Sequence, residues 1–121
     1  IGVLYYYGGH GVTKNLATAA SWYRKAAEAG SAAGQCNLAI CYYNGEGVTK
    51  NLRTARSWYQ KSADQNHASA MLKLGTMMVK GEGGERDVKE GVAMWEMAAA
   101  AGKEEAQAKL DRLHGFFDND M

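Results

Sequence analysis

The chain has 121 residues, a length that suits a single domain. Hydrophobic residues make up 46% of it and charged residues 22%, as in ordinary globular proteins. The formal net charge of +1 gives no electrostatic argument for a nucleic-acid or membrane-surface protein, and no apolar run is long enough to span a bilayer. We therefore expect no nucleic-acid partner and no membrane insertion by this segment.

The same segment recurs along the chain. Gly11, Gly47 and Gly83 are spaced 36 residues apart. Residues 9–30 and 45–66 are identical at about 14 of 22 positions, which is too many for chance. Such self-similarity indicates a stacked array of one supersecondary unit. Because the chain opens at Ile1 within a repeat, we expect a processed protein, a fragment or the ordered part of something longer, and the cellular compartment stays open.

Each repeat is predicted to hold two helices joined by a glycine-rich loop. The first copy has room for only a partial first helix, over residues 1–7, and its second helix is expected to begin at the N-cap Asn15. In the second copy, the first helix runs from about Ala32 to Tyr43 and is stopped by glycine. The second helix follows from the N-cap Asn51 to about Gln65.

The third copy is a looser version of the same unit. Its second helix is expected to begin at the N-cap Asp87. Trp95 stands one residue later than the spacing of Trp22 and Trp58 predicts. We attribute this slip to an extra residue, Gly84, and expect a one-residue deletion near residues 98–102 to restore the register.

The whole chain is therefore predicted to form one all-α domain. It holds about three repeats of 36 residues and closes on a single helix that caps the stack with a polar outer face. The predicted division is a single domain over residues 1–121, with a partial first repeat (1–30), a second repeat (31–66), a third repeat (67–102), a terminal helix (103–114) and an irregular tail (115–121).

The buried face of each second helix is expected to alternate small and large side chains, as interdigitated packing requires. The tryptophan and tyrosine side chains of these helices are expected in the core rather than displayed for a ligand. Trp22 and Trp58 are expected to fill the gaps beside the alanines. The residues expected to face inward are Leu16, Ala19, Tyr23 and Ala27 in the first copy, Leu52, Ala55, Tyr59 and Ala63 in the second, and Val88, Val92, Trp95 and Ala99 in the third.

Cys36 and Cys41 are the only cysteines in the sequence. Five residues apart on one helix, they point in different directions and stand too far apart for a disulfide. We expect both to behave as small buried hydrophobic residues.

The repeat resembles that of the Sel1-like repeat family, relatives of the tetratricopeptide repeats. The second copy carries the motif as Leu38-Ala39-x-x-Tyr42, Gly45-x-Gly47-Val48, Asn51, Ala55 and Trp58-Tyr59-Gln60-Lys61-Ser62-Ala63. The resemblance implies a right-handed α-solenoid whose concave surface holds other proteins, in an adaptor or scaffold role. Some cysteine-rich relatives have been linked to β-lactam binding, but Leu72 and Met77 stand at the positions of the two cysteines in the third copy, so that activity is not carried over.

The sequence shows no recognisable set of catalytic or metal-binding residues. His10, His67 and His114 have no partners at metal-ligand spacing, and no nucleophile–base set can be assembled. We therefore expect neither an enzyme nor a bound cofactor or metal. The remote alternative, an enzyme or small-ligand-binding protein, requires a defined pocket with clustered titratable groups.

The candidate binding site is a groove along the first helices of successive repeats, because the inner helices of a solenoid line its concave surface. A column of amides and cations there could hold an extended peptide of another protein by its carbonyl groups or acidic side chains. The residues that stacking brings into line are Asn37, Lys73 and Lys109; Ile40, Thr76 and Arg112; and Asn44 with Lys80.

Two roles fit such a protein-interaction module. One is a transient adaptor or scaffold. The other is a structural subunit fixed inside a large multi-protein complex, which the apolar ends Tyr5-Tyr6-Tyr7 and Phe116-Phe117 favour.

Overall fold

The structure is a computed structural model that describes residues 12–119. Within this range the chain forms helices and connections, without strands. The helices are α2 (Val12–Glu28), α3 (Ala32–Asn44), α4 (Leu52–Ala63), α5 (Ala68–Lys80), α6 (Val88–Ala100) and α7 (Glu104–Asn119).

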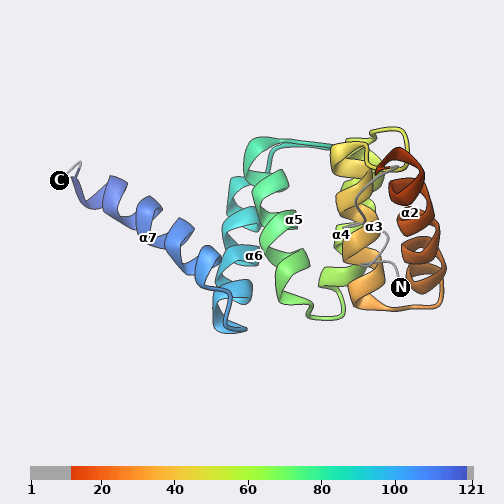
Figure 1. Ribbon diagram of the computed structural model, residues 1–121. Helices are drawn as coiled ribbons and strands as arrows, with labels where there is room; N and C mark the ends of the chain where they lie inside the picture. The colour runs from red at the N-terminus through yellow and green to blue at the C-terminus, as the bar shows by residue number, and fades with distance from the viewer. Residues whose placement is uncertain (1–11, 120–121) are drawn as a thin grey trace.

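The helices form an all-α solenoid, which confirms the predicted fold class. Each helix packs against the next one along the chain, from α2 on α3 to α6 on α7. Figure 1 shows α2 to α6 standing side by side, with their connections alternating between the two ends of the stack. The last helix, α7, starts beside the end of α6 and runs outward from the stack (Figure 1).

The second and third copies begin and end their helices as predicted. Asn51 and Asp87 are N-caps: the Asn51 side chain accepts a hydrogen bond from the backbone N–H of Thr54, and Asp87 from that of Glu90, both at 3.0 Å. Each bond satisfies an N–H group that has no partner inside the helix. At the other end of the loop, Gly45 closes α3 in the left-handed conformation, with φ 73°.

The first copy differs, because Asn15 lies inside α2 and is not its N-cap. In the second copy, the backbone N–H of the cap residue Asn51 binds the carbonyl of Tyr42 on the preceding helix at 2.9 Å, and this bond keeps the loop out of helical register. In α2 the carbonyls of residues 12–15 instead gain partners four residues later. The helix therefore starts one turn earlier than predicted.

The third repeat keeps the register of the second, so the predicted insertion at Gly84 and the compensating deletion are wrong. The turn after each second helix is made by Gly30, Asn66 and Gly102, which are evenly spaced by 36 residues. All three have positive φ, of 94°, 63° and 97°. The backbone therefore repeats without a slip through residue 102.

Trp95 consequently takes the position of Tyr59 rather than that of Trp58. Both side chains are buried, with 2% of Tyr59 and 8% of Trp95 exposed. The prediction matched Trp95 to the earlier tryptophans by residue type, whereas packing follows the spacing. The inward face of α6 is therefore formed by Gly91, Trp95 and Ala98, while Val88 is exposed and Val92 and Ala99 are half-buried.

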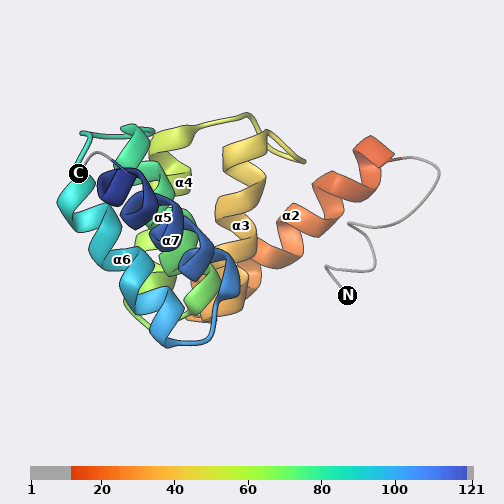
Figure 2. The same cartoon turned by 90° about the vertical axis from the view of Figure 1, so that its left-hand side faces the viewer.

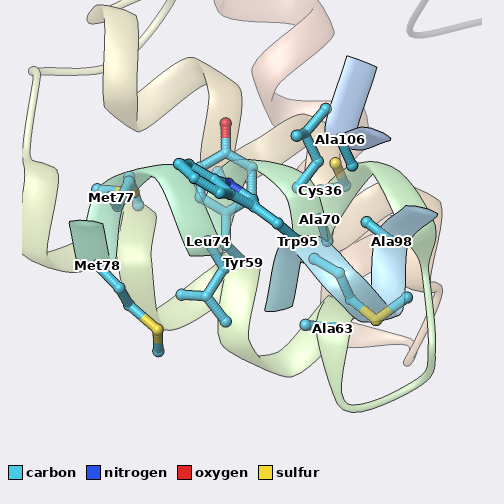
Figure 3. Packing of buried hydrophobic residues seen from close by; sticks show 14 of the residues in the cluster. Cys36, Tyr59, Ala63, Ala70, Leu74, Met77, Met78, Trp95, Ala98 and Ala106 are labelled. Atoms are coloured by element: carbon cyan, nitrogen blue, oxygen red, sulfur yellow. The ribbon is translucent and has the colours of Figure 1, made fainter. Parts of the chain in front are cut away.

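Buried apolar side chains form two clusters along the stack. The smaller one joins α2 to α3 around Ala19, Tyr23 and Leu38. The larger one extends from α3 to α7 and includes Tyr59 and Leu74 (Figure 3). Tyr23 and Tyr59 thus lie in the core, as predicted.

The tryptophan at the start of the stack is not a core residue. Trp22 is 40% exposed, whereas Trp58, at the same repeat position, is half-buried and contacts both clusters. No described helix precedes α2, so none covers Trp22 in the way that α2 covers Trp58. A lysine lies over each ring instead, with Lys25 Nζ 4.8 Å from the centre of the Trp22 ring and Lys61 Nζ 4.5 Å from that of Trp58.

The end of the chain is helical further than predicted. The irregular tail was expected from residue 115, but α7 continues to Asn119, and residues 120–121 lie outside the described range. One glycine weakens a helix by about 1 kcal/mol relative to alanine. Gly115 therefore does not end the helix by itself.

Both cysteines are buried, as predicted, and both thiols are free. Burial raises the pKa of Cys36 from 9.0 to about 11, although Lys73 and Lys103 oppose the shift. Burial also raises the pKa of Cys41 to about 11, and the nearby Glu46 carboxylate adds to the effect. Both thiols thus stay neutral in the folded chain where exposed thiols ionise.

We expect the free energy of unfolding to fall as the pH rises from about 9 to about 11. In that range the unfolded chain loses its thiol protons while the folded chain keeps them, so rising pH favours the unfolded state. Urea denaturation at several pH values measures this slope. Replacing both Cys36 and Cys41 by alanine should flatten it, and an unchanged slope in that variant would show that the thiols do not cause it.

Candidate partner-binding groove

A cavity of about 340 Å³ opens between the first helices of successive repeats, α3, α5 and α7. Its walls come from these three helices, and a residue of α4 and one of the α5–α6 loop complete it. The residues that line it are Ile40, Tyr43, Asn44, Tyr59, Lys73, Thr76, Met77, Lys80, Glu82, Glu105 and Lys109.

The cavity brings together most of the groove residues predicted from the sequence. Asn37, which is half-buried, and Arg112, which is exposed, lie on α3 and α7 but do not line it. The predicted residues that do line it are Ile40, Asn44, Lys73, Thr76, Lys80 and Lys109.

Tyr59 reaches the cavity from α4. Its side chain is only 2% exposed, and no described residue makes a hydrogen bond to its hydroxyl group. No fully buried side-chain oxygen or nitrogen of the described chain lacks a partner, so this hydroxyl reaches solvent through the cavity that Tyr59 lines. Figure 3 shows the hydroxyl at the end of the side chain that points away from Ala63.

A hydrogen bond between two repeats shapes the rim of the cavity. The Tyr43 hydroxyl on α3 donates to the Glu82 carboxylate in the α5–α6 loop, with its oxygen 2.9 Å from Oε1 and 2.8 Å from Oε2. Burial raises the pKa of Tyr43, and the Glu82 carboxylate raises it further, so the phenol stays a donor. Arg56 holds the same loop by donating to the backbone carbonyls of Glu82 (3.2 Å) and Glu85 (3.1 Å).

A second set of contacts joins the cavity to α6. The Thr76 hydroxyl donates to the carbonyl of Leu72 at 3.0 Å and accepts from Nε1 of Trp95 at 3.2 Å. Lys109 Nζ on α7 lies 5.6 Å from the centre of the Trp95 ring. The ammonium group of Lys109 is therefore held near the cavity by an aromatic face rather than by a carboxylate.

Positive charge exceeds negative charge around the cavity. Lys73, Lys80 and Lys109 border it, and so do the carboxylates of Glu82 and Glu105. Within residues 12–119, neither Lys73 nor Lys80 has a hydrogen-bond or ion-pair partner. The Glu82 carboxylate accepts the hydrogen bond from Tyr43. The second carboxylate of the cavity, that of Glu105, makes no such bond to Tyr43.

Sequence reasoning missed several lining residues. Glu105 lies four residues before Lys109 and thus on the same helix face, a spacing that could have identified it. Met77 could have been found in the same way from Lys73. Tyr43 and Glu82 are brought together by the stacking of two repeats, and Tyr59 was expected only as a core residue.

No group of three or more potential metal ligands occurs among the described residues. His67, one of the histidines considered above, is the N-cap residue of α5 and makes no capping bond with its side chain. The other two, at positions 10 and 114, lie where side chains are outside the described part. No helix of the described part is long and apolar enough to cross a membrane.

Three consecutive stretches of the chain match a family model described as Sel1 repeat, at residues 1–31, 32–67 and 68–103. Each boundary falls one residue after the one expected from the sequence. A search of curated proteins finds no match.

Solved structures of repeat proteins are similar to this chain. A Sel1 repeat protein from Oxalobacter formigenes has a TM-score of 0.81 and 44% identity, and the match covers 89% of this chain and 44% of that one. The protein c5321, a protective antigen of uropathogenic Escherichia coli strains that displays an SLR fold, has a TM-score of 0.83 and 30% identity, with coverage of 90% and 23%. Cysteine rich protein B of Helicobacter pylori has a TM-score of 0.63 and 27% identity, with coverage of 84% and 98%. The chain thus spans less than half the length of the first two proteins.

Proposed function

The chain belongs to the Sel1 repeat family, and we propose that it is a non-catalytic adaptor or scaffold module. We infer that it binds a segment of a partner protein in the groove between α3, α5 and α7. Proteins of this family generally act in protein–protein interaction. The groove here denotes the 340 Å³ cavity and the residues that line it.

The observation that supports this proposal most strongly is the groove itself. It is formed by the inner helices of successive repeats, the surface on which solenoids bind extended ligands. The ammonium groups of Lys73 and Lys80 are available to a ligand, because neither has a hydrogen-bond or ion-pair partner within residues 12–119. Apolar contact is available beside them from Ile40 and Met77.

The second role, a subunit fixed inside a large complex, has no comparable support. The apolar ends that favoured it are Tyr5-Tyr6-Tyr7 and Phe116-Phe117, whose side chains lie outside the described residues. We therefore propose the adaptor or scaffold role.

Peptide selection followed by groove mutation tests this proposal. Peptides would be selected from a random display library on the folded protein, and their affinity measured by fluorescence polarisation. We expect the double substitution Lys73→Ala and Lys109→Ala to weaken binding at least about tenfold, because it removes two charge-assisted contacts.

The matched control removes two exposed charges from the outer helices, with Arg53→Ala in α4 and Lys89→Ala in α6. This variant changes the net charge by the same amount and should bind as the parent does. Equal losses in both variants would mean that overall charge, not the groove, drives binding. Unchanged affinity in the groove variant would refute the proposed site.

A further inference from the structure

We propose that the groove selects a partner segment with an aspartate or glutamate side chain, whose carboxylate accepts a hydrogen bond from the Tyr59 hydroxyl group between Lys73 and Lys109. This inference rests on the proposed function and names the chemistry that the groove would recognise.

The Tyr59 hydroxyl is the first observation. The side chain is 98% buried, yet its hydroxyl has no partner among the described residues and reaches the cavity. A polar group at a buried position normally has a hydrogen-bond partner. A ligand atom in the cavity would supply the one that the protein does not.

The sign of the ligand atom follows from the protonation state of Tyr59. Burial is the largest cause that raises its pKa, and the nearby groups of Cys36, Tyr43 and Cys41 raise it further. The hydroxyl therefore stays protonated at physiological pH and can donate. Hydrogen bonds to an ionised acceptor are shorter and stronger than those to a neutral one, so a carboxylate is a better partner than an amide carbonyl.

The surrounding charges favour the same ligand. Lys73, Lys80 and Lys109 line the cavity, and of its two carboxylates, Glu82 is already bound by Tyr43. An anionic group would therefore meet more positive than negative charge. A basic side chain would meet three ammonium groups and would leave the Tyr59 hydroxyl without an acceptor.

We assign the carboxylate to a side chain and not to a chain terminus because of the position of the groove. The first helices of three successive repeats, α3, α5 and α7, all contribute residues to the cavity. An extended segment can contact all three helices along the stack, whereas a chain terminus would end inside the cavity.

The test compares paired peptides with paired variants. From a peptide selected on the protein, three forms would be made: the C-terminally amidated parent with its acidic residue, the amidated form with that residue replaced by glutamine or asparagine, and this neutral form with a free C-terminal carboxylate. We expect the neutral form to bind the unmodified protein at least about tenfold more weakly than the parent, since it lacks the charge that the lysines attract.

The substitution Tyr59→Phe probes the hydroxyl group alone, because phenylalanine keeps the ring in the core. It should weaken binding of the acidic peptide severalfold and leave binding of the neutral peptide unchanged. Circular dichroism in urea checks that the fold persists. Should this variant not fold, the peptide comparison on the unmodified protein still tests the preference for a carboxylate, and equal affinities would refute it.

Several results would overturn the inference. These are a selection without enrichment of acidic residues, equal affinity for the acidic and neutral forms, or equal weakening of both by Tyr59→Phe. Recovery of binding by the free-acid form would show that a terminal carboxylate is the ligand, contrary to the assignment. In each of these cases, loss of binding on Lys73→Ala with Lys109→Ala would leave the proposed function standing, so the two can fail separately.

Discussion

Replacing Gly47 by alanine is expected to lower the free energy of unfolding by about 3 kcal/mol or more, through two effects that add. Gly47 adopts φ 74°, a left-handed conformation in which a Cβ atom crowds the backbone. Holding an alanine in this conformation costs about 1–2 kcal/mol. A Cβ atom there would also collide with the backbone carbonyl of Leu16 in α2, the second helix of the preceding repeat. Backbone atoms held within a helix cannot move aside as a flexible side chain can.

Gly83 repeats this arrangement in the next copy. Its φ is 71°, and a Cβ atom would collide with the carbonyl of Leu52. Gly83→Ala should therefore have a similar effect. The two glycines thus fix how closely each glycine-rich loop lies on the preceding repeat.

Gly30→Ala is the matched control for these substitutions. Gly30 has φ 94°, but no atom of the described residues lies within 4 Å of the position of a Cβ atom. Its substitution therefore measures the conformational effect alone, expected at about 1–2 kcal/mol. Urea denaturation followed by circular dichroism gives all three values, and equal losses at Gly30 and Gly47 would show that the loop contact is looser than described.

The second large effect is expected where α5 and α6 cross. Gly91→Ala should lower the free energy of unfolding by about 2 kcal/mol, because the added methyl group overpacks a filled interface. Its Cβ atom would stand 2.7 Å from the carbonyl oxygen of Gly75 and 2.7 Å from Cγ2 of Val79. A glycine in a helix interior ordinarily gains about 1 kcal/mol on substitution by alanine, so the sign is reversed here.

Gly115→Ala in α7 provides the contrast. Among the described residues, no atom lies within 4 Å of a Cβ atom at this helical position, so the substitution should stabilise the protein by up to about 1 kcal/mol. The two variants are the same chemical change in helices of the same fold. A stabilising Gly91→Ala would contradict the described approach of α5 and α6.

The fold could be predicted because the repeats carry the same residues at the positions where helices begin and end. Asn51 and Asp87 cap helices and Gly45 ends one, and these short-range roles hold in the second and third copies, although not at Asn15 in the first. The prediction failed where it followed residue type instead of spacing. Matching Trp95 to Trp58 required a slip that the backbone does not make, because Gly91 and Trp95 occupy the positions of Ala55 and Tyr59.

The groove could be predicted in part for the same reason. Side chains on the first helices, such as Lys73 and Lys109, come into line by the repeat spacing alone. The remainder depends on contacts between repeats that spacing does not encode. The hydrogen bond from Tyr43 to Glu82 joins an α3 side chain to a loop 39 positions later. Tyr59 reaches the groove from α4, the second helix of its repeat.

Amide chemical-shift mapping shows whether a partner segment binds in the groove between α3, α5 and α7. Isotope-labelled protein would be titrated with a selected peptide, and the shifted backbone signals placed on the structure. We expect the largest shifts around Ile40, Lys73 and Lys109, on the three helices that form the groove. Shifts concentrated instead on the outer helices α4 and α6, with those three positions unmoved, would contradict this expectation.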